Sequence, residues 1–483
     1  MVVSEMNLLF NFAAFKDRKA IITQSGEHFS YDDLVRECDR FQPFFESRDK
    51  KLVMILAKNN IETIIGYLAA VQSNNAAMMI DAHLDSEILN NLISTYQPDF
   101  IWRPENGDGV FGYQEYELID YRWEQQPEIH SDIAVLLSTS GSTGSPKLVR
   151  LTKQNVIANA RSIAAFLHLN ETERAITNLP VHYSYGLSVI NSHLTVGATI
   201  LLTDTPIVKR EFWDFFKAEG GTSLTGVPYT YEILKRMGFS QMELPSLRYM
   251  TQAGGKLSIE LVLEYAELSR LKKFDFWVMY GATEATARIA YLDPAYSVSK
   301  SGSIGKSIPG GKLWLEDEEG NPVTDPLLEG ELIYEGPNVM MGYGYCREDL
   351  AKSDKLLGVL KTGDIGYFDN EGFFYITGRK SRFLKILGKR IGLSDIEHHL
   401  QSLGFNCYVG GQDELLLIAY HQEELQDVSK VILNNIKKEV FTRFKIPMDL
   451  IQVIPMQHIP RTSSGKINYA SFGFKLNQKS TFK

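Results

Sequence analysis

The chain has 483 residues, of which 44% are hydrophobic and 23% are charged. This length predicts two or more domains, and these proportions are typical of a globular protein and exclude a disordered chain. The 50 Lys and Arg against 59 Asp and Glu give a net charge of −9. That balance argues against a dedicated nucleic-acid binder, because such a protein needs a basic face.

The cysteines and the apolar runs exclude further classes. Cys38, Cys346 and Cys407 lie too far apart for a CxxC pair, which argues against a structural zinc site and against a disulfide framework. The N-terminal segment has no basic start followed by a long apolar core, as a signal peptide would have. No apolar run approaches the ~20 residues of a membrane span. We therefore expect a cytoplasmic protein without a membrane span.

Strand and helix patterns alternate through the middle of the chain. An apolar strand at 133–138 enters a Gly/Ser loop, and a strand at 147–152 precedes a helix that Thr152 would cap. The further expected strands lie at 199–204, 222–227, 247–252 and 275–280, and the expected helices at 209–218, 229–237 and 259–269. This alternation predicts a mainly parallel sheet covered by helices.

After about residue 300 the strands become short and are separated by Gly, Pro, Asn and Asp, which favours antiparallel hairpins. A compact block follows, with a hairpin around Gly410–Gly411 and helices at 394–402 and 426–441. We therefore predict an α/β protein with two domains. The large N-terminal domain, 1–378, combines parallel-rich sheets covered by helices with an antiparallel subdomain. The small, mobile α+β C-terminal domain spans 379–483.

The segment from Thr139 to Lys147 reads TSGSTGSPK. Small residues let backbone N–H groups close around phosphate oxygens, the hydroxyls add donors, and Lys147 adds positive charge. It is not a Walker A loop, because Pro146 replaces the glycine required before the lysine. A flexible surface loop is the alternative, but the flanking strands favour a phosphate loop. The candidate phosphate-binding residues are Thr139, Ser140, Gly141, Ser142, Thr143, Gly144 and Lys147.

This segment resembles the phosphate-binding signature of the adenylate-forming superfamily, which includes acyl-CoA synthetases, peptide-synthetase adenylation domains and firefly-type luciferases. Further signatures follow in the family's order: YGATEA at Tyr280–Ala285, GPNVMMGY at Gly336–Tyr343, KTGDIGYFDNEGFFYITGR at Lys361–Arg379, and PRTSSGKI at Pro460–Ile467. The resemblance covers essentially the whole chain and is closest to stand-alone acyl-CoA synthetase-like ligases.

The resemblance implies an ATP- and Mg²⁺-dependent site. A carboxylate that attacks the α-phosphorus of ATP is an anion attacking an anion, so the protein must neutralise charge and fix the geometry. By resemblance, Glu284 binds Mg²⁺, Thr283 contacts the α-phosphate and Tyr280 packs on the adenine. Taken alone, Glu284 is also consistent with an exposed carboxylate at a strand end, and Asp364 with a turn residue. The other implied nucleotide-binding residues are Gly254, Gly255, Gly281, Asp364, which would accept the ribose hydroxyls, and Arg379.

Two lysines after the predicted boundary have different implied roles. Lys466 matches the family lysine that bridges the attacking carboxylate and the α-phosphate, a task that suits an ammonium point charge. Lys385 matches a lysine of the thiol-transfer step, and the family's small domain rotates between the two steps. At the hinge, Ser381 replaces the usual acidic residue. The local basic cluster would meet CoA or an acidic carrier protein, or is a solvated face. Its members are Arg379, Lys380, Arg382, Lys385, Lys389 and Arg390.

The implied acyl-site signature is LPVHYSYGLS, Leu179–Ser188. Many acyl-CoA ligases of the family have a histidine three residues after the proline, where this chain has Tyr183, with His182 one residue earlier. The aspartate with which peptide-synthetase domains hold an α-amino group does not occur here, so an amino-acid substrate is disfavoured. The candidate pocket residues, for which core packing is the alternative, are His182, Tyr183, Tyr185, Gly186, Val227, Pro228 and Tyr229.

Together these features predict an ATP-dependent ligase for a small carboxylic acid. It would form an acyl-adenylate and pyrophosphate, and then transfer the acyl group to the thiol of CoA. The alternatives are transfer to the phosphopantetheine arm of a separate acyl carrier protein, a luciferase-like oxidoreductase, and a non-catalytic nucleotide-binding relative. The signatures of zinc peptidases, GxSxG hydrolases and Walker A nucleotide-binding proteins do not occur in the sequence.

Overall fold

The structure is a computed structural model. It describes residues 12–47, 49–124, 126–138, 147–380, 382–387, 389–412, 414–422, 430–461 and 467–469. The chain divides into two compact units. The first unit comprises 1–313 and 334–360, and the second comprises 314–333 and 361–483. The segment 361–378, which the sequence places in the large domain, thus clusters with the C-terminal residues, and a boundary at Arg379 stays a prediction.

A nine-stranded sheet forms one half of the first unit, in the order β16-β15-β14-β13-β12-β10-β11-β1-β2. Its inner strands run parallel, as predicted, and antiparallel strands close both edges. The strands are β1 (Lys19–Thr23), β2 (His28–Ser30), β10 (Arg174–Ile176), β11 (Thr199–Leu202), β12 (Ser223–Gly226), β13 (Tyr249–Gln252), β14 (Asp275–Tyr280), β15 (Ala290–Leu292) and β16 (Lys306–Ser307).

An eight-stranded sheet forms the other half, in the order β19-β9-β8-β4-β3-β5-β7-β6. Every residue of β3 is buried, and alternate side chains enter two different cores: Val53 and Ile55 one, Leu52 and Met54 the other. The strands are β3 (Leu52–Ala57), β4 (Ala76–Asp81), β5 (Phe100–Pro104), β6 (Phe111–Tyr113), β7 (Tyr116–Asp120), β8 (Ile133–Ser138), β9 (Leu148–Thr152) and β19 (Tyr343–Gly344).

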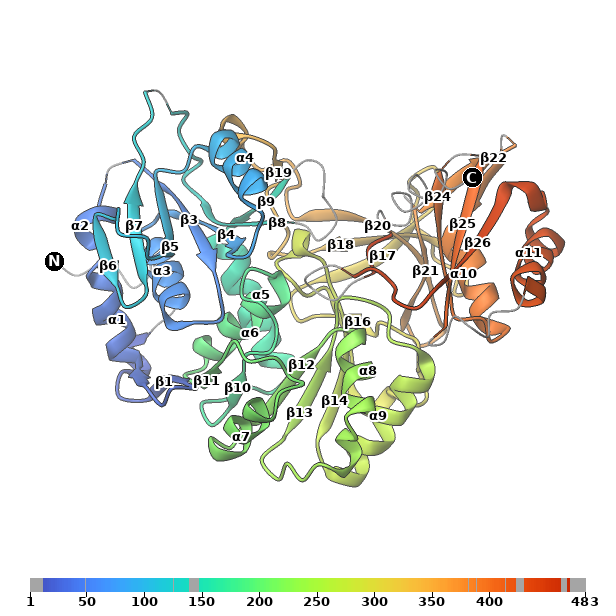
Figure 1. The fold of residues 1–483 in the computed structure, drawn as a ribbon, viewed down its shortest axis with the longest axis horizontal. Helices are drawn as coiled ribbons and strands as arrows, with labels where there is room; N and C mark the ends of the chain where they lie inside the picture. The colour runs from blue at the N-terminus through green and yellow to red at the C-terminus, as the bar shows by residue number, and fades with distance from the viewer. Residues whose placement is uncertain are drawn as a thin grey trace. The chain divides into compact units, whose positions relative to one another are not determined.

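Helices cover both sheets of the first unit. Between the sheets, α5 contacts β8 and β9 while its neighbour α6 contacts β11 (Figure 1). Thr152 caps α5 as predicted, since its hydroxyl accepts the backbone N–H of Asn155 at 3.0 Å. The helices are α1 (Tyr31–Asp39), α2 (Gln42–Phe45), α3 (Ile61–Gln72), α4 (Ser86–Tyr96), α5 (Lys153–Phe166), α6 (Ser184–Thr195), α7 (Arg210–Ala218), α8 (Pro228–Arg236) and α9 (Ile259–Lys272).

The second unit carries a four-stranded sheet, a short hairpin and a three-stranded sheet with two helices. These elements are β17 (Lys312–Glu316), β18 (Gly330–Glu335), β20 (Val359–Phe368), β21 (Phe374–Arg379), β22 (Phe383–Ile386), β23 (Lys389–Gly392), α10 (Leu393–Ser402), β24 (Cys407–Gln412), β25 (Leu415–His421), α11 (Lys430–Phe444) and β26 (Ile451–Met456). In the part of the chain that the structure describes, no helix combines the length and the apolar character needed to cross a bilayer.

The structure confirms the α/β class. It differs from the sequence prediction in the position of one hairpin turn and in the bounds of one helix. The hairpin expected around Gly410–Gly411 is present, but both glycines lie inside β24, opposite Leu417 and Leu416 of β25, so the turn comes later. The expected helix 426–441 corresponds to α11, and residues 423–429 lie outside the described part. Glycine pairs are common turn signals, and here the strand pairing of the flanking apolar residues overrides that signal.

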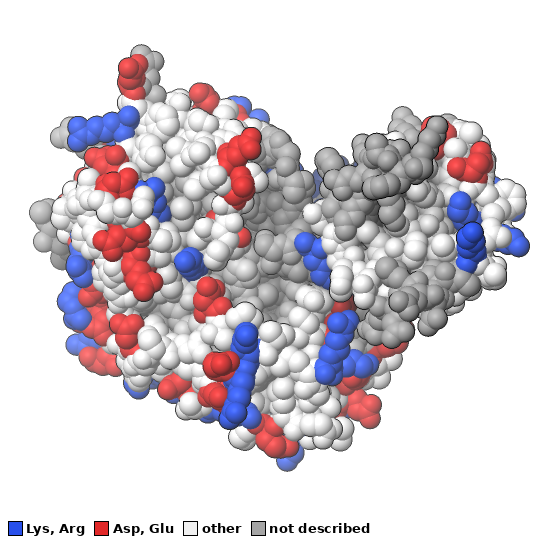
Figure 2. Space-filling model, in the orientation of Figure 1, with Lys and Arg blue, Asp and Glu red and all other residues white. Residues whose placement is uncertain are grey.

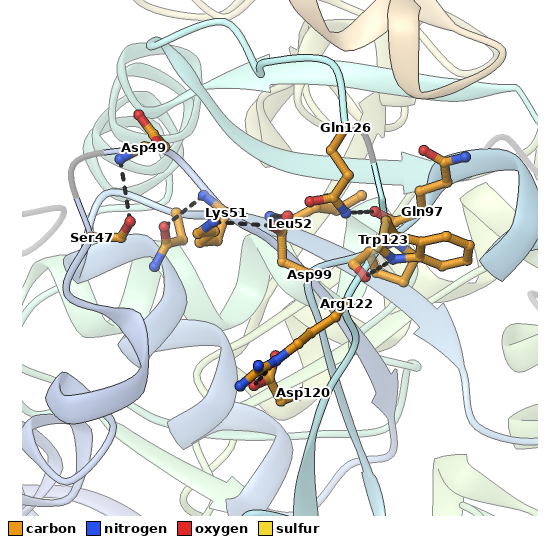
Figure 3. Close-up of polar contacts among 12 residues, drawn as sticks. Ser47, Asp49, Lys51, Leu52, Gln97, Asp99, Asp120, Arg122, Trp123 and Gln126 are labelled. Carbon is orange, nitrogen blue, oxygen red and sulfur yellow. Dashed lines mark hydrogen bonds and ion pairs between the residues drawn. The ribbon is translucent and has the colours of Figure 1, made fainter.

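Asp99 joins distant segments of the first unit. Its buried carboxylate accepts the backbone N–H of Leu52 at 2.8 Å and lies 3.4 Å from the ammonium of Lys51 (Figure 3). The guanidinium of Arg347, which is also buried, donates to the same carboxylate at 3.1 Å. Arg347 begins the 3₁₀ helix Arg347–Ala351, so this ion pair fixes a segment almost 250 residues away in sequence.

We expect Asp99→Ala to lower the free energy of unfolding by about 3–5 kcal/mol, because it leaves Arg347 buried without its carboxylate. Urea unfolding followed by circular dichroism measures this loss. The control is Asp120→Ala, whose carboxylate lies 3.6 Å from the exposed guanidinium of Arg122 (Figure 3). That exposed pair contributes no more than about 1 kcal/mol. Equal losses in the two variants would contradict this account of Asp99.

Candidate active site

The YGATEA segment begins at Tyr280, the last residue of β14, which is an inner strand of the nine-stranded sheet. In parallel sheets, ligands bind beyond the carboxyl ends of the strands. A Cβ at Gly281 would overlap the carbonyl oxygen of Ala287, so only glycine allows this close backbone approach. Thr283 and Glu284 then lie in a single 3₁₀ turn, Thr283–Ala285. Both candidate residues therefore lie on one tight turn at the carboxyl end of this inner strand.

Two strained residues follow that turn. Thr286 has a φ of 56° and Ala287 a φ of 123°, values that residues with a side chain rarely adopt. Asn338 holds the strained turn in place: its carbonyl accepts the Thr286 hydroxyl at 2.6 Å, and its side-chain amide donates to the carbonyls of Ala285 at 2.7 Å and Arg288 at 2.9 Å. The GPNVMMGY signature therefore fixes the backbone of the YGATEA signature. Strain of this kind is concentrated at functional sites.

Glu284 is oriented by Tyr343. The Tyr343 hydroxyl donates to Oε1 of Glu284 at 2.7 Å, and the ammonium of Lys147 lies 3.9 Å from the centre of the Tyr343 ring. Tyr343 stands on β19, paired with Val149 of β9. The end of the phosphate-loop segment, the YGATEA turn and the last residue of GPNVMMGY thus meet around one carboxylate. Sequence reasoning assigns no role to Tyr343, although its place at the end of that signature is the available signal.

The donors around Glu284 fit a magnesium ion that is shared with a nucleotide. Among the described residues, no group of three His, Cys, Asp or Glu could hold a metal by itself. Mg²⁺ is bound through one or two carboxylates together with substrate phosphates and water, so one oriented carboxylate suffices. The Thr283 hydroxyl lies 3.1 Å from that of Ser184, the first residue of α6. The turn beyond β14 and the start of α6 therefore adjoin.

The LPVHYSYGLS segment forms the start of α6. Tyr183 occupies the N-cap position, and a Cβ at Gly186 would overlap the carbonyl of Pro180, so the first helical turn packs tightly on the preceding loop. Tyr183 and Tyr185 are buried, which raises the pKa of each to about 12 and keeps both rings neutral. The Tyr185 hydroxyl donates to the carbonyl of Thr251 on β13 at 2.9 Å.

The other candidate pocket residues lie on neighbouring segments. The Nε2 atom of His182 is 3.8 Å from the Asp81 carboxylate at the end of β4, and burial lowers the pKa of His182. Val227 is buried and Tyr229 partly buried, on either side of the Pro228 that begins α8. A Cβ at Gly255 would approach the Pro228 ring to 3.2 Å. The segment expected to line the adenine therefore packs directly against one expected to line the acyl pocket.

In the second unit, Asp364 and Arg379 face each other across β20 and β21, with Nε of Arg379 3.3 Å from Oδ1 of Asp364. Gly254, in the first unit, has a φ of 81° that favours glycine.

Two residues of the basic cluster form ion pairs inside the second unit. Lys380 pairs with Glu331 at 2.8 Å, and Arg382 pairs with Glu397 at 2.9 Å. These pairs favour a structural role for Lys380 and Arg382 over the predicted contact with CoA or a carrier protein.

Several predicted site residues lie outside the described part of the chain. These are Thr139, Ser140, Gly141, Ser142, Thr143 and Gly144 of the phosphate loop, Ser381 at the hinge, and Lys466. Lys385 lies on β22, where its backbone pairs opposite Arg390 of β23. The roles of all these residues stay predictions.

Comparison with known proteins gives the family. The AMP-binding enzyme family matches residues 10–344. A 2-succinylbenzoate–CoA ligase of Bacillus velezensis is 30% identical over 351 residues, 71% of this chain and 69% of that protein. An oxalate–CoA ligase of Arabidopsis thaliana is 26% identical over an alignment of 509 positions that covers 95% of this chain and 96% of that protein. The chain belongs to the AMP-binding enzyme family.

Solved structures agree with this assignment. The o-succinylbenzoate coenzyme A synthetase of Bacillus subtilis in complex with ATP and a magnesium ion has a TM-score of 0.76 and 26% identity, over 97% of this chain and 99% of that one. The same synthetase with its acyl-adenylate intermediate has a TM-score of 0.76 and 24% identity, over 96% and 97%. The predicted family, fold class and acid–thiol ligase class are confirmed. The luciferase-like and non-catalytic alternatives are not favoured.

Proposed function

We propose that this chain activates a carboxylic acid with ATP, releasing pyrophosphate, and passes the acyl group from the adenylate to the thiol of CoA. The observation that carries this proposal is the convergence of Lys147, Tyr343 and Glu284 from three signatures around one carboxylate. Family membership supports the same chemistry. A cytoplasmic location stays a prediction from the sequence.

The residues of the turn beyond β14 supply the charge and hydrogen bonds that adenylation needs. Tyr343 fixes Oε1 of Glu284 and leaves the other carboxylate oxygen to hold Mg²⁺, which when bound would offset the charge of the phosphates. The hydroxyl of Thr283, next to that of Ser184, is available to donate to the α-phosphate. Because these groups are fixed before the substrates arrive, they stabilise the charge that develops in the transition state without reorganising.

The acceptor proposed is CoA, because the relatives reported above are CoA ligases. Transfer to a carrier protein lacks comparable support, and the pairing of Arg382 with Glu397 removes one charge that could have bound an acidic carrier. Nucleic-acid binding stays disfavoured as a function of this chain. On the face drawn in Figure 2, Lys and Arg are interspersed with Asp and Glu over the described surface.

ATP–pyrophosphate exchange with a panel of acids tests the first half-reaction without any acceptor. The panel should include monocarboxylic and dicarboxylic acids, since 2-succinylbenzoate and oxalate both carry two carboxylates. Acids that support exchange are then incubated with CoA, and thioester formation is followed by mass spectrometry. Absence of exchange with every acid would refute the proposed function, whereas exchange without thioester would refute only the acceptor.

Asp364→Ala should raise the KM for ATP by about tenfold and change the KM for the acid little. The reason is that ribose contacts lie away from the reacting phosphorus and supply uniform binding. Steady-state kinetics with each substrate varied in turn measures the two KM values separately. The control is Glu371→Ala, an exposed residue in the turn of the same β20–β21 hairpin. Equal effects of Asp364→Ala on both substrates would indicate a structural role for its contact with Arg379.

A further inference from the structure

Arg288 is a fully buried cation, with 2% of its surface exposed. It follows the strained pair Thr286 and Ala287, and its guanidinium lies over the Tyr185 ring, 3.9 Å from the ring centre. Its hydrogen bonds are weak: Nε donates to the sulfur of Met279 at 3.3 Å, and Nη1 to the carbonyl of Ala287 at 3.5 Å. Burial lowers its pKa, and an arginine stays protonated at neutral pH.

Other buried arginines of this unit donate to oxygen acceptors of the chain, although Nε of Arg150 has no hydrogen-bond partner among the described residues. Arg347 pairs with Asp99, and the guanidinium of Arg150 donates to the carbonyls of Met341, Lys352 and Ser353. For Arg288, by contrast, the charged or titratable groups in range among the described residues are the neutral Tyr183 and Tyr185, and no described carboxylate pairs with it. A buried charge without a partner is costly, so proteins keep one where a ligand completes the pair.

Arg288 is one of the residues that line a small cavity. The cavity has room for roughly one water molecule. The polar groups that share the cavity wall with Arg288 already have partners. Ser188 donates to the carbonyl of Tyr185 at 2.7 Å, Thr225 to the side chain of Asn178 at 2.8 Å, and His193 is bonded to Tyr249 at 2.8 Å. Arg288 is thus the cavity group whose bonding capacity is least used.

We propose that Arg288 binds a second anionic group of the acid, so that the substrates of this chain are compact dicarboxylic acids. This inference rests on the proposed function. Glu284 and Arg288 flank the strained pair Thr286 and Ala287. The side chain of Glu284 contacts Tyr343, and the guanidinium of Arg288 lies over the ring of Tyr185. One turn would then serve both ends of the reaction: Glu284 the nucleotide, and Arg288 the end of the acid remote from the reacting carboxylate. Arg288 is a specificity-determining residue in this scheme.

The test compares matched acids in ATP–pyrophosphate exchange. Each dicarboxylic acid (succinate, glutarate, phthalate) is paired with its mono-amide, which keeps the size and removes one charge. For the wild type, kcat/KM for the best diacid should exceed that for its mono-amide by about 10²-fold, the cost of leaving a buried charge unpaired. Arg288→Gln should bring the two within about fivefold, mainly through the KM of the diacid. Arg288→Lys should recover part of the preference.

The control variant is Arg161→Gln, which removes an exposed charge from α5 and should keep the wild-type preference. ATP binding by calorimetry shows whether the Arg288 variants are folded, and if they are not, the wild-type comparison decides alone. Exchange supported by mono-amides and monocarboxylic acids as well as by diacids overturns the assignment of Arg288 and leaves the proposed function standing. No exchange with any acid overturns both.

Discussion

Replacing Glu284 by alanine is expected to slow ATP–pyrophosphate exchange by about 10²–10³-fold, the usual cost of losing a principal electrostatic group. The carboxylate is the one around which three separate signatures meet, and Tyr343 holds it through a hydrogen bond of 2.7 Å. In the proposed mechanism, its loss would leave the magnesium ion without a ligand from this turn, and the phosphates would keep more of their charge against the incoming carboxylate.

The Glu284 experiment needs two companions. Tyr343→Phe removes the hydroxyl that orients the carboxylate but keeps the ring beneath Lys147, and should cost only about tenfold. Glu267→Ala removes an exposed carboxylate from α9 and should leave exchange unchanged. Exchange is measured across a range of Mg²⁺ concentrations. A Glu284→Ala enzyme that keeps wild-type exchange throughout that range would remove Glu284 from the catalytic residues.

Local sequence patterns predict those strands and helix caps that depend on only a few neighbouring residues. The apolar runs 133–138 and 275–280 correspond to β8 and β14 to the residue, and Thr152 caps α5 through a contact three positions away. The choice of Glu284 and Thr283 came from family signatures, because a single carboxylate at a strand end carries no distinguishing pattern. In each case the information lay in contiguous sequence.

Contacts that arise only from packing could not be predicted in this way. The hydroxyl of Tyr343 reaches Glu284 across 59 positions, and Arg288 is buried because a strained turn directs it inward. In the sequence, ATARI is an ordinary stretch with one charge. The sequence places Arg382 in a basic cluster, yet its guanidinium pairs with Glu397 from α10 and lies 3.9 Å from the Tyr469 ring centre. Side-chain partners of this kind depend on tertiary structure, which one sequence does not encode locally.

The two lysines of the second unit should separate the half-reactions. In the adenylate-forming family the small domain rotates between adenylation and transfer, and each step uses a different lysine. We propose the same for this chain. Lys466 belongs to a Gly/Ser segment near the end of the sequence, and Lys385 to β22, directly after the predicted hinge at Ser381. An ammonium at the α-phosphate stabilises charge in the transition state, whereas the thiol needs positioning more than charge.

Lys466→Ala is therefore expected to lower ATP–pyrophosphate exchange by about 10²–10³-fold and to leave thioester formation from supplied acyl-adenylate largely intact. Lys385→Ala should show the reverse pattern with a smaller loss, and Ser381→Pro, which locks φ near −65°, should impair the switch and spare one half-reaction. Lys430→Ala, an exposed lysine at the start of α11, is the control and should affect neither. Each variant is assayed for both half-reactions separately. If Lys466→Ala damages both equally, rotation between two lysines does not describe this enzyme, and Lys466 is better interpreted as a residue for folding or nucleotide binding.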